Sequence, residues 1–311
     1  MRNSVGPMIL GVSLIVSGCH KRADRSQPAA AQSAVTQIAW REGDVDDAFA
    51  EAKEAKKPVL LYWGAKWCPP CNLMKQTLFK DPSFIAETAN FIPVHLDGDA
   101  KDAQNWGEKF GIAGYPTVII LTPDRREVTR LAGGSTASQL ADVLKVAATR
   151  TTSTEELLKR ADDPANLSAD DWRLLSSFDW FDDPKHFGDY PKAAAYLGKL
   201  AQAAPDPAMK RHFVLTGLLM ATGTSDKPKL TADQQAQVRT ILPAILSSYD
   251  EVKANRQEVG SAAGLILALP DPAARKMLGD TLTAALDRVA ADESIPLYDR
   301  LATAQAEITL S

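Results

Sequence analysis

The sequence is poor in the residues that build metal centres, with three cysteines and four histidines among its 311 residues. A structural zinc site takes about four ligands at short, regular spacings. His186 and His212 have no cysteine or carboxylate partner at such a spacing. For zinc to bind at Cys68 and Cys71, a second cysteine or histidine pair would be needed nearby, and His95 alone does not provide it. We therefore predict no metal site and no cofactor.

An excess of positive charge is also missing. The chain has 35 Lys and Arg against 39 Asp and Glu, which gives a formal net charge of -4 at pH 7. Proteins that bind nucleic acid carry a basic face, and this sequence has no basic patch interleaved with aromatic residues. The charge balance therefore argues against a nucleic-acid partner. With 45% hydrophobic and 24% charged residues, the chain is long enough for two globular domains.

The apolar run near the N-terminus, from Val5 to Val16, is too short to span a bilayer. It follows a charged start and ends in the small pair Ser17-Gly18, which is typical of a secretory signal. The ending Val16-Ser17-Gly18-Cys19 resembles the lipobox of bacterial lipoproteins. That resemblance implies that Cys19 is diacylglyceryl-modified and becomes the first residue of the mature protein. The alternative is an ordinary signal peptide or an uncleaved anchor, with Cys19 incidental.

We expect residues 1–18 to be a lipoprotein signal peptide and residues 19–36 to be a flexible tether, because the segment is polar, small and without periodicity. Two or more acyl chains hold a protein firmly on a membrane surface. These features predict a location in the bacterial cell envelope, with a membrane anchor through lipid on Cys19 and the folded part in the periplasm.

The other two cysteines, Cys68 and Cys71, stand at the start of a predicted helix. A strand-like apolar run, Val59 to Trp63, precedes them, and the small pair Gly64-Ala65 turns the chain. The first N–H groups of a helix carry partial positive charge and favour a thiolate, so Cys68 is expected to be the attacking sulfur of low pKa. Cys71 lies three residues on, on the same helix face and one turn deeper, and is expected to be the resolving sulfur.

Two prolines separate the cysteines. Pro69 and Pro70 fit a first helical turn, where proline lacks only an N–H that would be unpaired. Each also removes a donor to the Cys68 sulfur, so we expect a modest depression of its pKa and a pair that leans towards donating electrons. The charge of Lys66, two residues before Cys68, favours the thiolate, although a lone surface lysine is often only solvated.

The segment Trp67-Cys68-Pro69-Pro70-Cys71, placed after such a strand, resembles the active site of the thioredoxin superfamily. A second segment, Gly114-Tyr115-Pro116-Thr117, resembles the cis-proline loop of that family. The resemblance implies that Pro116 is cis and lies against the two sulfurs. It also implies that Tyr115 presents backbone groups to an extended substrate chain, and it places Trp67 in the substrate site.

One position departs from the family pattern. Many thioredoxins bury an acid on the strand six residues before the first cysteine, where it helps to manage the proton of the resolving thiol. Tyr62 stands there in this sequence. A phenol with a pKa of about 10 is a poor base at neutral pH. The sequence names no replacement for the acid.

The predicted elements follow the order β-α-β-α-β-α-β-β-α of the thioredoxin fold, an α/β fold with a central mixed sheet flanked by helices, over residues 37–150. Residues 77–85 and 94–97 also resemble the periplasmic reductase domain of thiol:disulfide interchange proteins. Strands are expected at 38–40, 59–63, 91–96, 118–121 and 127–131, and helices at 44–56, 68–79, 83–89, 99–110 and 137–148.

After a polar linker the pattern changes. Apolar positions recur at helical spacing from residue 155 to the end without a convincing strand pattern, which predicts an all-helical domain over residues 155–311. This region also holds an aromatic cluster for which core packing is favoured over a binding surface. Its members are Trp172, Phe178, Trp180, Phe181, Phe187 and Tyr190.

Two classes of function fit these features. The first is an exported thiol-disulfide oxidoreductase whose Cys68-Pro-Pro-Cys71 pair reduces protein disulfides and is re-reduced by an upstream dithiol electron donor. The second is a membrane-tethered scaffold whose helical domain recognises a partner and whose cysteines are structural or bind a metal. The combination of the cysteine motif with the proline loop favours the enzyme.

Overall fold

The computed structural model describes residues 36–132, 137–181, 183, 186–223, 228–295, 297 and 300. The predicted signal peptide, the lipidation site Cys19 and nearly all of the predicted tether lie outside the described residues. Among the helices of the described part, none combines the length and the apolar character needed to cross a bilayer.

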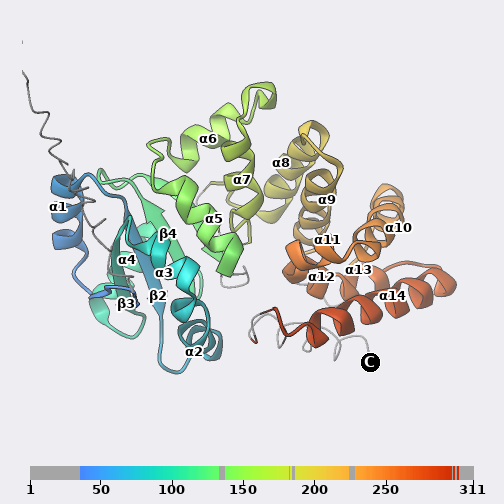
Figure 1. The fold of residues 1–311 in the computed structure, drawn as a ribbon. Helices are drawn as coiled ribbons and strands as arrows, with labels where there is room; N and C mark the ends of the chain where they lie inside the picture. Colours follow the sequence, from blue (N-terminus) through green and yellow to red (C-terminus); the bar gives the residue numbers. More distant parts are fainter. Residues whose placement is uncertain are drawn as a thin grey trace, which may run out of the picture. The chain divides into compact units, whose positions relative to one another are not determined.

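Five strands form one mixed sheet in the order β1-β3-β2-β4-β5 (Figure 1). The first three are parallel, whereas β4 and β5 run antiparallel to their neighbours and are joined by a hairpin. Only a short turn separates β4 from β5, and helices connect the parallel strands. The bounds are β1 Arg41–Glu42, β2 Val59–Gly64, β3 Ile92–Asp97, β4 Thr117–Leu121 and β5 Glu127–Ala132.

The first strand was predicted at residues 38–40, and that position is wrong. The structure places β1 at Arg41–Glu42, where it pairs with Val94 and His95 of β3. Ile38 is buried in the core and Trp40 packs against it. The apolar residues at 38 and 40 therefore pack in the core and do not pair in the sheet. The backbone pairs with β3 only from Arg41.

Helices cover both faces of the sheet, as the alternation along β2 requires. Leu60 and Tyr62 point into one apolar cluster with residues of α2, α3 and α5. Val59, Leu61 and Trp63 point into the other, with residues of α1 and α4. The bounds are α1 Val45–Ala55, α2 Pro69–Gln76, the 3-10 helix η1 Leu78–Lys80, α3 Pro82–Thr88, α4 Lys101–Phe110 and α5 Ala137–Ala147.

The described residues after α5 are helical and contain no strand. Several of these helices begin with an aspartate cap followed by proline, as Asp206-Pro207 and Asp271-Pro272 do, because proline lacks only an N–H that a first turn leaves unpaired. The bounds are α6 Thr154–Arg160, the 3-10 helix η2 Pro164–Asn166, α7 Ala169–Ser177, α8 Tyr190–Ala203, α9 Pro207–Thr222, α10 Ala232–Ser247, α11 Tyr249–Ala254, α12 Arg256–Ser261, α13 Ala263–Leu267 and α14 Pro272–Ala291.

The apolar core of the sheet continues into these helices. Leu131 of β5, Leu144 of α5, Leu175 of α7 and Phe213 of α9 belong to one cluster of buried residues. The aromatic cluster of residues 172–190 mainly packs there, since Trp172, Phe178 and Trp180 are buried and Phe181 and Phe187 are partly buried against it. Tyr190 remains exposed.

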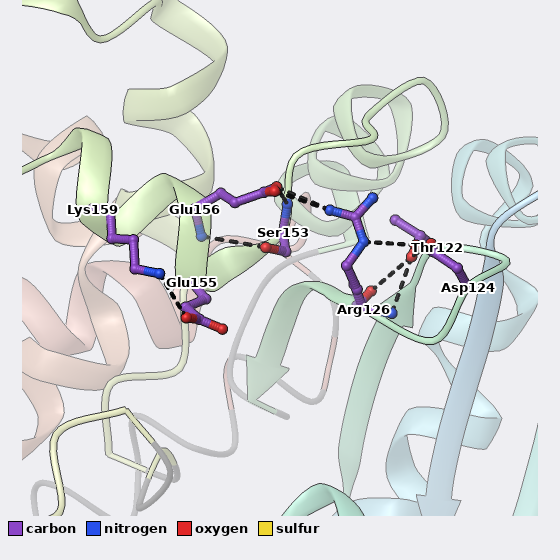
Figure 2. Close-up of polar contacts among 7 residues, drawn as sticks. All are labelled: Thr122, Asp124, Arg126, Ser153, Glu155, Glu156 and Lys159. Carbon is purple, nitrogen blue, oxygen red and sulfur yellow. Dashed lines mark hydrogen bonds and ion pairs between the residues drawn. The ribbon is translucent and has the colours of Figure 1, made fainter.

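A polar contact also joins the β4–β5 hairpin to α6 (Figure 2). Nε of Arg126 donates to Asp124 across the hairpin turn, and Nη1 donates to both carboxylate oxygens of Glu156 at 3.1 Å. Glu156 simultaneously accepts from the backbone N–H of Ser153, whose hydroxyl caps α6. One carboxylate therefore serves as a helix cap and as the ion-pair partner of the hairpin.

Candidate active site

Cys68 and Cys71 form a disulfide bond at the start of α2, with an S–S distance of 2.10 Å and a Cα–Cα distance of 5.3 Å. Cys68 is the N-cap of the helix, which was predicted at residues 68–79 and begins one residue later, at Pro69, and ends at Gln76. Because Pro69 and Pro70 carry no N–H, the first donor to the Cys68 sulfur is the backbone N–H of Cys71, at 3.2 Å. Cys71 is fully buried, whereas Cys68 keeps 3% of its surface exposed. The pair is therefore approached from the side of Cys68.

The loop before β4 lies against this pair. The peptide between Tyr115 and Pro116 is cis, as predicted. The carbonyl oxygen of Tyr115 is 3.7 Å from Sγ of Cys68, and the Tyr115 ring packs against the two cysteines and Ala65. Two segments that are 47 residues apart in the sequence thus meet at one sulfur.

Trp67 stands beside this contact with 65% of its surface exposed. Its indole Nε1 donates to both carboxylate oxygens of Asp99, at 2.9 and 3.0 Å, and its ring meets the Tyr115 ring edge-on at 6.2 Å. Asp99 was not among the predicted site residues. Its one sequence signal is its position two residues after the end of β3, the strand that pairs with β2 before the cysteines.

The Tyr115 side chain is held on the same side. Burial, followed by the charges of Asp99 and Asp97, raises the pKa of Tyr115 above its usual value, so the phenol stays protonated. Its hydroxyl donates to the carbonyl of Gly98 at 3.1 Å. A Cβ on residue 98 would lie 2.4 Å from the tyrosine ring, so glycine is what lets the ring lie there.

Tyr62 is fully buried on β2, and its ring lies against Phe79 of η1 at 4.8 Å. Its hydroxyl has no hydrogen-bond partner among the described residues, and burial raises its pKa above the usual value. The ring stacks on His95 at 5.2 Å, and Nδ1 of that histidine is 2.8 Å from Glu42. At the position where many thioredoxins bury an acid, Tyr62 therefore packs as an apolar side chain and does not accept a proton.

Lys66 is exposed and contributes its backbone carbonyl, which accepts from the side-chain amide of Asn72 at 2.8 Å. This bond ties the loop before the cysteines to α2. Asn72 was also not among the predicted site residues, and no local pattern distinguishes it. Within the described ranges, no group of three or more His, Cys, Asp or Glu is placed to hold a metal ion.

The comparisons with known proteins concern the part of the chain that holds this site. Residues 45–148 match a family model described as a thioredoxin-like domain. A thioredoxin from Alicyclobacillus acidocaldarius is 32% identical over 104 residues, which cover 32% of this chain and 94% of that protein. The chain belongs to the thioredoxin family.

A thiol:disulfide interchange protein and a solved structure are also similar to this domain. The thiol:disulfide interchange protein DsbD 1 of Pseudomonas aeruginosa is 32% identical over 110 residues, which cover 34% of this chain and only 19% of that protein. A solution structure of a putative disulphide-isomerase from Bacteroides thetaiotaomicron is 24% identical, covers 37% of this chain and 96% of that one, and has a TM-score of 0.33. The thioredoxin family and the names of the two sequence relatives support a disulfide oxidoreductase. The family match ends at residue 148, before α6.

Proposed function

We propose that this protein is an exported thiol-disulfide oxidoreductase that reduces protein disulfides through Cys68 and Cys71. The observation that carries the proposal is the disulfide at the start of α2 with Sγ of Cys68 3.7 Å from the carbonyl oxygen of Tyr115. A sulfur at a helix N-terminus is stabilised as a thiolate, which is the nucleophilic form.

In the first step the Cys68 thiolate attacks one sulfur of a substrate disulfide. The substrate S–S bond breaks, a mixed disulfide with Cys68 forms, and the other substrate sulfur leaves as a thiolate that takes up a proton. In the second step the sulfur of Cys71 attacks Sγ of Cys68. The Cys68–Cys71 bond forms as the mixed-disulfide bond breaks, and the proton of the Cys71 thiol ends on the departing substrate sulfur. Two electrons have then passed from the pair to the substrate.

The residues around the pair bind the substrate. Tyr115 offers its backbone to the extended chain next to the substrate cysteine, Pro116 lies against the sulfurs, and the exposed indole of Trp67 covers the flanking residue. Lys66 adds positive charge near the Cys68 thiolate. Because Pro69 and Pro70 supply no N–H, the thiolate is stabilised less than it would be by a complete helix start, and the pair donates electrons more readily.

A protein that reduces disulfides needs an electron donor that reduces its own cysteines again. Each turnover leaves Cys68 and Cys71 oxidised, so an upstream dithiol donor must reduce them again. Protein disulfides are the substrates and protein dithiols the electron source.

The place of action follows from the N-terminal sequence. Residues 1–18 form the signal peptide, Cys19 carries the lipid, residues 19–36 are the tether, and the folded part, with a thioredoxin-like domain at 37–150 and a helical domain at 155–311, lies in the periplasm at the membrane surface. Radioactive palmitate fed to expressing cells should label the wild-type protein and not Cys19→Ser. Equal labelling of both would contradict the lipid anchor.

The activity is tested with the full chain and insulin as the test disulfide. Wild type should reduce insulin with a dithiol donor, Cys68→Ser should lose the activity, and Cys19→Ser should keep it in detergent-free solution. Cys71→Ser should accumulate a mixed disulfide on Cys68, whose mass identifies the substrate. Full activity of Cys68→Ser would overturn the proposal in favour of a scaffold.

A further inference from the structure

Outside the cysteine site, the charged side chain of Arg130 is buried and donates several hydrogen bonds. Arg130 of β5 is 0% exposed, and its Nε and Nη2 each donate to the Glu127 carboxylate at 3.1 Å. Glu127 is buried as well. A buried ion pair of this kind persists only when the remaining donors are also satisfied.

The remaining donors of Arg130 reach the end of α4. Nη2 donates to the carbonyl of Phe110 at 2.6 Å and Nη1 to the carbonyl of Gly111 at 2.9 Å. Gly111 ends α4 in the left-handed conformation. The last carbonyls of a helix have no intrahelical partner and carry partial negative charge, so a guanidinium from another element caps them well.

These two carbonyls immediately precede the loop with Tyr115 and Pro116. At the far end of that loop, Thr117 of β4 pairs with Ala132 of β5. The strand β5 therefore holds both ends of the loop, one through backbone pairing and the other through the side chain of Arg130.

A segment of the helical region also contacts Arg130. The backbone N–H of Asp179 donates to the carbonyl of Arg130 at 3.0 Å. Burial by itself lowers the pKa of Arg130, but the hydrogen bonds and charge of Glu127, followed by the charges of Asp183 and Asp179, outweigh it and raise the pKa. The guanidinium is therefore charged and fixed in place.

We propose that Arg130 is a positioning residue, which places the Tyr115–Pro116 loop over the Cys68–Cys71 pair by holding the carbonyls of Phe110 and Gly111. This inference rests on the proposed function, because its consequence is the binding of a disulfide substrate. The planar fork of arginine is needed, since one ammonium cannot reach the carboxylate and both carbonyls.

The test compares Arg130→Lys with Arg126→Lys in the full chain. Arg126 lies in the same hairpin but forms an exposed ion pair with Glu156. We expect kcat/KM for insulin to fall about tenfold in Arg130→Lys, mainly through KM, because misplacing a binding group by about 1 Å is costly. Amide hydrogen exchange should become faster at residues 111–117. The pH dependence of Cys68 alkylation should stay as in wild type, because α2 sets it. Arg126→Lys should change none of these.

Two outcomes overturn the inference. One is a folded Arg130→Lys with kcat/KM within twofold of wild type and unchanged exchange at residues 111–117. The other is exchange that rises uniformly over the sheet, which shows a purely structural role. If Arg130→Lys does not fold, the charge-neutral double variant Glu127→Gln/Arg130→Gln takes its place with the same expectations. A wild type that fails to reduce insulin contradicts the proposed function, while the exchange data still decide the positioning of the loop.

Discussion

The side chain of Tyr62 occupies the space that a Cβ on Gly64 would need, at the end of β2. A Cβ on residue 64 would lie 2.3 Å from the hydroxyl oxygen of Tyr62 and 2.6 Å from its Cζ. Both residues lie on the strand that leads into the cysteine loop and, two apart, on the same face of the sheet. The tyrosine therefore requires the glycine.

Replacing Gly64 by alanine should destabilise the fold by about 1–3 kcal/mol, because the tyrosine ring must shift within a packed core. The free energy of unfolding in urea measures this. Gly198→Ala is the matched control, since a Cβ there meets nothing within 4 Å and α8 gains helix propensity. Equal effects of the two substitutions would show that the Tyr62 contact does not matter.

Tyr62→Phe should leave stability unchanged or raise it by up to about 1 kcal/mol, because it removes a buried hydroxyl that has no hydrogen-bond partner in the described structure. Tyr196→Phe should instead cost about 1 kcal/mol, since that hydroxyl donates to the carbonyl of Leu158 at 2.8 Å.

The same Tyr62→Phe variant tests the chemistry. Its pH profile for insulin reduction between pH 6 and 8 should follow that of wild type, because burial keeps the phenol protonated in this range. A loss of activity that depends on pH would assign Tyr62 a role in proton transfer.

Trp67→Ala should lower kcat/KM for a protein disulfide about tenfold and leave the unfolding midpoint in place, because the exposed indole adds contact area for the substrate and little to the core. Asp99→Ala, which frees the indole, should give a smaller loss of the same kind. Met277→Ala controls for removal of an exposed apolar side chain far along the chain. Unchanged kinetics in Trp67→Ala would remove this residue from the substrate site.

Asp171 of α7 should make stability depend on acid pH. Burial raises the pKa of Asp171, but bonds from Ser168 and Arg150 outweigh it and lower the pKa in the folded state; Arg160 also donates to this carboxylate, at 2.6 Å. A lowered folded-state pKa gives stability that is present above the unfolded value of about 4 and is lost as pH falls through the folded one.

Asp171→Asn should therefore cost about 3 kcal/mol at pH 7, and its stability should fall less steeply between pH 4 and 2 than that of wild type. Denaturation curves at each pH measure this. Asp170→Asn, at the exposed neighbouring position, should keep the wild-type pH dependence. Parallel curves for Asp171→Asn and wild type would contradict the assignment.

The local patterns of the sequence determined the strand, turn and helix around Cys68 and Cys71 and the succession of helices after residue 154. These elements depend on residues close together in the chain, whose periodicity, caps and prolines act over a few positions. The proline loop at Pro116 was expected from its resemblance to the loop of the thioredoxin superfamily. The cap of α3 shows the limit of such patterns. This helix was expected to begin at residue 83, but it begins at Pro82 and Asp81 caps it.

Only the tertiary structure decided which distant side chains meet. Two contacts show this: Trp67 bonds to Asp99, and Arg130 reaches from β5 to the end of α4. No periodic pattern in the sequence predicts either contact. They arise because packing the sheet and its helices brings together residues far apart in the chain. For Arg130, burial makes an unsatisfied donor costly, which favours the arrangement that gives the guanidinium its partners.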